Sequence, residues 1–200
     1  MRGHLILSLF ILFTALFQSA CTPVTVVPEV TEDEIAHEKA RLKRSYLKDR
    51  FDEEERVLNI GYPILKAGLE FCEEGVWTTG LRVWNINSFD FSRYRDFAED
   101  EFSLDRGLKV KYVIKGFPAD KAGVKKDAHI LAVDGKDLKK GSGALRSYTK
   151  AMDKNEKASV RYLIEQNGIV REYDVPKVAV CKSPIVYHAD DGAVNAYADG

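Results

Sequence analysis

The stretch GFPADKAGVKKDAHILAVDGKDL, residues 116–138, is the part of this sequence that decides the fold. Pro118 fixes φ at the start of a short helical turn, and Gly123 is placed to end that turn in the left-handed conformation. The apolar run at 129–133 is typical of a short strand, and Asp134-Gly135 is typical of a tight turn. The stretch therefore predicts one helical turn followed by a strand and its return.

The same stretch resembles a PDZ domain of the bacterial protease-associated type, and the resemblance covers residues 77–176. That family has a strand, the pattern Gly-x-Pro-Ala-x-x-Ala-Gly-Val, a Gly-Asp pair, and a second strand that ends in Asn/Asp-Gly. The residues that match are Gly116, Pro118, Ala119, Ala122, Gly123, Val124, Ile130, Leu131, Val133, Asp134 and Gly135. Asp127-Ala128 stands where Gly-Asp is usual, so we expect strain or different hydrogen bonding in that turn.

The flanking sequence alternates in the way that strands do. Residues 81–86 and 108–114 have a period of two, and residues 158–175 contain two such runs joined by Asn167-Gly168, a strong hairpin signal. Helical patterns lie at 94–102 and 143–152. We therefore predict an α+β chain, in which an N-terminal helical segment precedes a PDZ-like small β-barrel or sandwich with two short helices.

The resemblance implies a site for peptide or protein C-termini, bound as an added strand. Residues 78–81 are the implied carboxylate loop, and Gly80 allows close backbone approach. The implied peptide-binding residues are Thr79, Gly80, Leu81, Arg82, Val83, Leu145 and Tyr148. The alternative is that these side chains are core, which applies to Leu145 and Met152 above all. The segment 90–107 is placed to cover the groove.

The helical segment is expected at residues 31–72. Thr31 and Glu34 have the spacing of a capping box, and the dense charges that follow leave one narrow apolar stripe. We expect the helix to break or kink near Gly61-Tyr62-Pro63, because proline removes a donor and clashes with the preceding turn.

The first twenty residues form a secretory signal, with a cationic head, an apolar run from Leu5 to Phe17 and small residues before Cys21. The Ser19-Ala20-Cys21 ending resembles the bacterial lipobox, although Gln18 stands where leucine is usual. We expect Cys21 to be lipidated and residues 21–30 to be a tether, so that a lipid anchor holds the exported chain in the periplasm-facing cell envelope. By analogy with related lipoproteins, Thr22 indicates the outer membrane. Plain secretion is the alternative.

Cys72 and Cys181 lie on either side of the PDZ-like segment. An exported chain meets an oxidising compartment, so we predict that they form a disulfide; two buried free thiols are the alternative.

Composition argues against several functions. The chain has 200 residues, 45% hydrophobic and 30% charged, and its net charge of −1 does not favour a nucleic-acid partner. The four histidines, His4, His37, His129 and His188, have no metal-ligand spacing. No catalytic residue, metal site or cofactor is predicted in this chain.

Residues 177–200 resemble the start of a zinc metallopeptidase domain. The run Asn195-Ala196-Tyr197-Ala198-Asp199-Gly200 is similar to the opening strand of HtpX-like (CAAX prenyl protease type) peptidases, and the order of signal, helix, PDZ-like segment and this strand also matches. The resemblance implies the N-terminal, non-catalytic part of an envelope zinc peptidase, with zinc and the H-E-x-x-H motif only beyond this chain. The chain has no H-E-x-x-H motif, so we expect it to be inactive alone even though it resembles a zinc metalloendopeptidase family, and whether the protein is an enzyme stays open. The alternatives are a complete lipid-anchored adaptor and a lipoprotein with a blocked groove.

We expect residues beyond about Tyr187 to be poorly packed.

Overall fold

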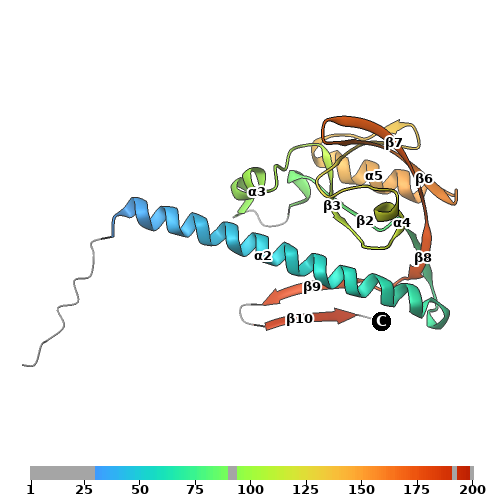
Figure 1. Ribbon diagram of the computed structural model, residues 1–200, viewed down its shortest axis with the longest axis horizontal. Coiled ribbons are helices and arrows are strands. Elements are labelled where there is room, and N and C mark those ends of the chain that lie inside the picture. Colours follow the sequence, from blue (N-terminus) through green and yellow to red (C-terminus); the bar gives the residue numbers. More distant parts are fainter. Residues whose placement is uncertain (1–29, 90–93, 191–192, 199–200) are drawn as a thin grey trace, which may run out of the picture. The chain divides into compact units, whose positions relative to one another are not determined.

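The computed structural model describes residues 30–89, 94–190 and 193–198 (Figure 1). The chain divides into two compact units, residues 1–37 and 38–200. Helix α2, Glu32–Ala67, begins in the first unit and continues into the second. The predicted capping box is present: the Glu34 N–H donates to the Thr31 hydroxyl at 3.2 Å, and the Thr31 N–H donates to the Glu34 carboxylate at 2.8 Å. These hydrogen bonds lower the pKa of Glu34.

The helix was predicted to break or kink near Gly61-Tyr62-Pro63, and the break is wrong. The helix continues through Pro63 to Ala67 and then tightens into the 3-10 turn η1, Gly68–Phe71. A proline inside a helix costs about 3 kcal/mol. Packing offsets that cost: the Tyr62 ring meets the Phe117 ring edge-on, with centroids 5.6 Å apart, and Leu65 packs against a buried cluster. Tertiary contacts therefore override the local preference.

A six-stranded antiparallel sheet follows the helix. The strand order is β2-β3-β4-β6-β7, with β5 paired to β4, so β2 and β7 are the terminal strands. The bounds are β2 Leu81–Trp84, β3 Leu108–Val113, β4 His129–Val133, β5 Lys136–Asp137, β6 Ser159–Gln166 and β7 Ile169–Pro176. Both predicted tight turns are present, with φ of 50° and 75° at Asp134-Gly135 and 53° and 74° at Asn167-Gly168.

Short helices join these strands. Two of them, α3 and α5, agree with the predicted helical patterns to within a residue. The bounds are η2 Ile86–Ser88, α3 Arg95–Glu101, α4 Pro118–Lys121, η4 Gly141–Gly143 and α5 Ala144–Asp153.

Two apolar clusters hold the second unit together. One joins α4 and α5 to the sheet, and its members include Val110, Tyr148 and Tyr162. The other joins α2 to the opposite side of the sheet through Leu47 and Phe51, which are almost fully buried. Only Leu47, Phe51 and Leu58 are buried along the described helix, as the predicted narrow stripe requires. The fold is α+β, with a long helix ahead of the sheet.

Two smaller sheets complete the unit. Strand β1, Gly75–Thr78, pairs with β8, Val178–Cys181, and the predicted Cys72–Cys181 disulfide closes this end, with 5.7 Å between the Cα atoms. Strands β9, Ile185–Asp190, and β10, Ala193–Ala198, form a hairpin of their own. The side chains of residues 188–200, including Tyr197, lie outside the described part, so the expected loose packing there stays a prediction.

The predicted signal sequence and the predicted lipidation site, residues 1–21, also lie outside the described residues. Within the described part, the helices are too short or too polar to span a bilayer.

Candidate functional site

A groove of about 360 Å³ lies between the terminal strand β2 and helix α5. Both elements line it, together with parts of α2 and β3 and the end of η2. The lining residues are Phe51, Glu54, Leu81, Arg82, Val83, Trp84, Ser88, Phe89, Lys111, Leu145, Tyr148 and Thr149. In the described sheet, β3 pairs with one edge of β2 and no strand pairs with the other. The groove therefore runs beside backbone N–H and C=O groups that the sheet leaves available.

The structure brings together five of the seven predicted site residues: Leu81, Arg82, Val83, Leu145 and Tyr148 all line the groove. Leu145 is 39% exposed, although it is a large apolar side chain on a helix that packs against the sheet. Met152 instead packs against the core, where its sulfur accepts from the Tyr162 hydroxyl at 3.4 Å. A core role was the alternative for both residues. Met152 has that role, whereas Leu145 lines the groove.

Thr79 and Gly80, the other two predicted residues, are buried and do not line the groove. The Thr79 hydroxyl bonds to the Tyr162 hydroxyl at 3.1 Å, and the Gly80 N–H donates to the Thr78 hydroxyl at 3.0 Å. Gly80 has φ +84°, and a Cβ added there would lie 2.5 Å from the Phe117 Cβ. Packing inside the fold is therefore enough to require glycine here, and its role in a carboxylate loop stays a prediction.

Helix α2 supplies a part of the groove that the sequence did not predict. Phe51 and Glu54 lie some thirty positions before β2 in the chain, and nothing in their local pattern distinguishes them from other residues of a charged helix. The contact depends on a bulge in β3. Arg82 pairs with Tyr112 and Val83 with Val110, so Lys111 is the extra residue.

The bulge turns Lys111 and Tyr112 toward the same helix. The Lys111 ammonium lies 2.7 Å from the Glu54 carboxylate, and the Tyr112 hydroxyl donates to that carboxylate at 2.9 Å and to the Phe51 carbonyl at 3.1 Å. The ammonium also lies 4.6 Å from the Phe51 ring centroid and 5.2 Å from the Trp84 ring centroid. Burial lowers the pKa of Lys111, and the charge of Glu54 opposes that shift.

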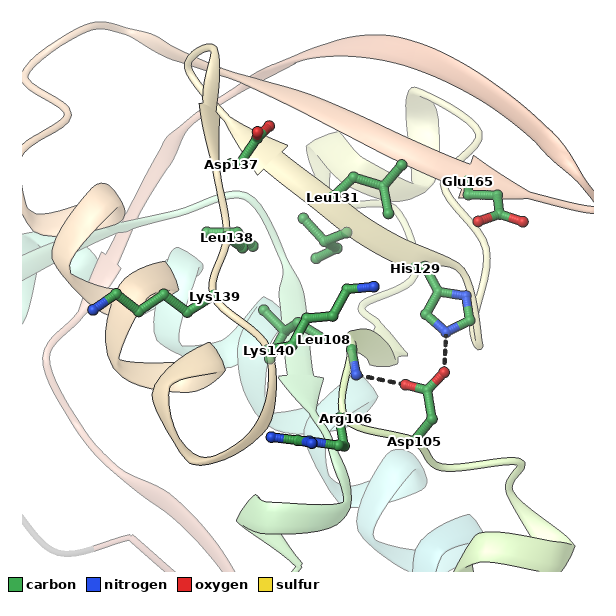
Figure 2. Close-up of a pocket in the computed structure, with 12 residues that line it drawn as sticks. Asp105, Arg106, Leu108, His129, Leu131, Asp137, Leu138, Lys139, Lys140 and Glu165 are labelled. Atoms are coloured by element: carbon green, nitrogen blue, oxygen red, sulfur yellow. Dashed lines mark hydrogen bonds and ion pairs between the residues drawn. The ribbon is translucent and has the colours of Figure 1, made fainter.

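A second cavity, of about 710 Å³, lies over β4 and the start of β3 (Figure 2). Its floor is apolar, with Leu108, Leu131 and Leu138. Asp105 accepts from the Gly107 N–H at 2.6 Å, and its carboxylate lies 3.1 Å from His129 Nε2. Charges of both signs surround this cavity, and no feature of it selects one class of ligand.

The resemblance to zinc peptidases raises the question of a metal. Across the described part of the chain, no group of three His, Cys, Asp or Glu side chains is placed to hold a metal ion. The described residues therefore do not fit a zinc ion.

Neither a protein-family model nor a curated protein matches this chain. Among solved structures it is similar to the PDZ domain of HtrA3 bound to a phage-derived ligand (FGRWV), with 14% identity, a TM-score of 0.38, and coverage of 54% of this chain and 89% of that one. It is also similar to a PDZ domain protein from Parabacteroides distasonis, with 12% identity, a TM-score of 0.39, and coverage of 56% of this chain and 22% of that one.

Proposed function

We propose that this chain binds an extended polypeptide segment, which lies in the groove and adds to the sheet as a strand beside β2. The observation that carries the proposal is the position of β2. It is a terminal strand, and the groove beside its outer edge contains a half-exposed apolar side chain, Leu145. Unpaired main-chain groups give such a strand its affinity, and pockets for alternate side chains give it specificity.

The side chains of Leu81 and Val83 belong to the same side of the sheet as α5, because Leu81 is part of the cluster around Tyr148 and Val83 packs against that cluster. An apolar ligand side chain between them and Leu145 would lose its contact with water. Burial of one leucine-sized side chain contributes roughly 1.5–3 kcal/mol.

We further propose that the ligand ends in this groove, with its carboxylate at residues 78–81. This loop directly precedes β2, and the positive φ of Gly80 gives its backbone a sharp turn. Backbone N–H groups in such turns can bind a terminal carboxylate.

A peptide titration tests the binding site. The exported chain, prepared with Cys21→Ser to avoid lipid, is titrated with a library of fluorescent C-terminal peptides, each also made as its C-terminal amide. We expect saturable binding to peptides with an apolar C-terminus, and weaker binding to the amides. Leu145→Asp is expected to weaken binding at least about tenfold.

The matched control is Ile169→Asp on β7, an apolar residue of similar exposure, 51%, which lies at the other edge of the sheet. Binding should be unchanged in this variant. Absence of saturable binding to every peptide, with a folded protein, would overturn the proposal and favour a blocked groove.

We also propose that the chain is exported and held by a lipid at Cys21 in the cell envelope, at the outer membrane. The charged head, the apolar run and the small residues before Cys21 support this proposal. Mass spectrometry of the protein from its native membranes should show an acylated N-terminal cysteine. A mature protein that begins elsewhere, or carries no acyl group, would favour plain secretion.

Within that setting, the groove would present polypeptide ends to a zinc peptidase domain on the same polypeptide. The order of segments and the run at 195–200 support this proposal, and a lipid-anchored adaptor without catalysis is the alternative. Reading the coding DNA beyond Gly200 separates them. An in-frame H-E-x-x-H motif within about a hundred codons supports the peptidase, and an immediate stop codon supports the adaptor.

A further inference from the structure

The side of the groove that faces helix α2 differs from the side that faces α5 in the side chains that β2 presents to it. Side chains alternate along β2: Leu81 and Val83 are on the α5 side, whereas Trp84 belongs to the cluster that contains Phe51 of α2. Arg82 lies between Leu81 and Val83, so it is on the α2 side together with Trp84. A polypeptide beside β2 would also alternate, so one set of its side chains would point toward α5 and the other set toward α2.

Helix α2 is firmly attached at this position. Besides the contacts of Lys111 and Tyr112, Glu55 forms an ion pair with Lys126 at 2.9 Å. Further along the helix, the Asn59 side chain accepts from the Lys115 N–H at 2.8 Å. A helix held by side-chain and backbone contacts over two turns is a rigid surface. It is therefore able to select a ligand and not only to shield one.

The charged residues that line the groove are Glu54, Arg82 and Lys111, and their charges do not cancel. Lys111 is matched by Glu54, at 2.7 Å. Arg82 is exposed, and its side chain forms no ion pair or hydrogen bond with a described residue, although its backbone pairs with Tyr112 in the sheet. One positive charge therefore remains on the receiving strand, where a side chain of an added strand would lie opposite it.

We propose that helix α2 is the second wall of the groove, and that Arg82 selects polypeptides with an acidic side chain in the set that faces α2, while the apolar set faces α5. The inference rests on the proposed binding of a polypeptide beside β2. Directly opposite side chains on neighbouring strands have Cβ atoms about 5 Å apart, so an acidic residue there can reach the guanidinium. Arg82 is the specificity residue, and Glu54 holds Lys111 in place next to it.

The first test compares peptides that differ only in charge. Two peptides share the same apolar set and carry either Glu or Gln at one position of the alternate set, and each position of that set is tried in turn. We expect the protein to bind one Glu peptide about two- to fivefold more tightly than its Gln partner at low salt. The preference should shrink as the salt concentration rises.

Arg82→Gln should remove that preference while the Gln peptide still binds, and Arg82→Glu should reverse it in favour of a Lys peptide. The matched control is Arg171→Gln, because Arg171 is an exposed arginine on β7, the opposite terminal strand. This variant should keep the preference. If no peptide binds, the proposed function fails together with this inference. If peptides bind, but the Glu and Gln peptides have equal affinity and the Arg82 variants do not change it, only the selection by Arg82 is overturned.

The second test locates the wall directly. A benzophenone amino acid placed in the alternate set of the bound peptide should crosslink to α2 around Phe51 and Glu54. The same group placed in the apolar set should crosslink to α5 around Leu145 and Thr149. Mass spectrometry of the digested product identifies both sites. Crosslinks to α5 alone, from either set, would overturn the second wall.

Discussion

At the scale of single residues, Asp127 shows where this chain departs from the pattern it resembles. It replaces the usual glycine and has φ +67°, a conformation that is unfavourable for residues with a side chain. Its N–H donates to the Val110 carbonyl at 2.9 Å, so the surrounding backbone holds it in place. The strain expected from the sequence is present, and it is located at one residue.

Asp127→Gly should therefore raise the free energy of unfolding by up to about 1 kcal/mol, measured by urea denaturation. Asp134→Gly is the control, because Asp134 also has a positive φ, of 50°, but its carboxylate accepts from the Asn155 amide at 2.6 Å and the Arg161 N–H at 3.2 Å. Removing those bonds should lower stability by about 1–2 kcal/mol. A loss of stability in both variants would show that the Asp127 side chain has a role its backbone does not reveal.

At the scale of elements, the Cys72–Cys181 disulfide restrains the C-terminal end of helix α2, the second wall of the groove. Cys72 follows η1 directly after α2, and Cys181 is the last residue of β8. The bridge closes 109 residues of sequence, which include the whole six-stranded sheet. It thus joins the C-terminal end of α2 to the strand that leaves the sheet.

Replacing both cysteines by alanine should lower the free energy of unfolding by about 2–5 kcal/mol. We also expect the Glu-over-Gln peptide preference to weaken more than the binding of the apolar set, because α2 is the wall that the bridge restrains. Urea denaturation and the same peptide titrations measure the two effects. If the Glu-over-Gln preference and the binding of the apolar set weaken equally, the result would indicate general loosening of the fold instead.

Sequence reasoning found most of the elements, since turn chemistry at Gly123, Asp134-Gly135 and Asn167-Gly168 is local. It also found the α5 side of the groove through the resemblance. It missed β1 and the contribution of α2, because both depend on partners far away in the chain: β8 for one and the β3 bulge for the other. The continuation of α2 through Pro63 was missed for the same reason, since the local pattern does not show how Tyr62 and Leu65 pack.

At the scale of the whole molecule, buried tyrosine hydroxyls in the two apolar clusters make the free energy of unfolding depend on pH at high pH. Burial raises the pKa of Tyr112, Tyr148 and Tyr162 above the ordinary value of 10.0. Above that pH the unfolded chain releases these protons while the folded chain keeps them. The unfolded state then binds fewer protons, so the free energy of unfolding falls as the pH rises.

Each such tyrosine contributes a slope of up to about 1.4 kcal/mol per pH unit, so the three together reach about 4 kcal/mol per unit. Lys111 acts in the opposite direction below its ordinary pKa of 10.5, since its folded pKa is lowered, and it offsets part of the loss there. Urea denaturation from about pH 8 to about pH 11 should show a plateau and then a steep decline. Tyr148→Phe should reduce that decline by about a third, because one of the three groups is removed and the ring remains. An unchanged slope in this variant would mean that Tyr148 ionises without loss of the fold, and that the wall of the groove at α5 is more open to water than its burial indicates.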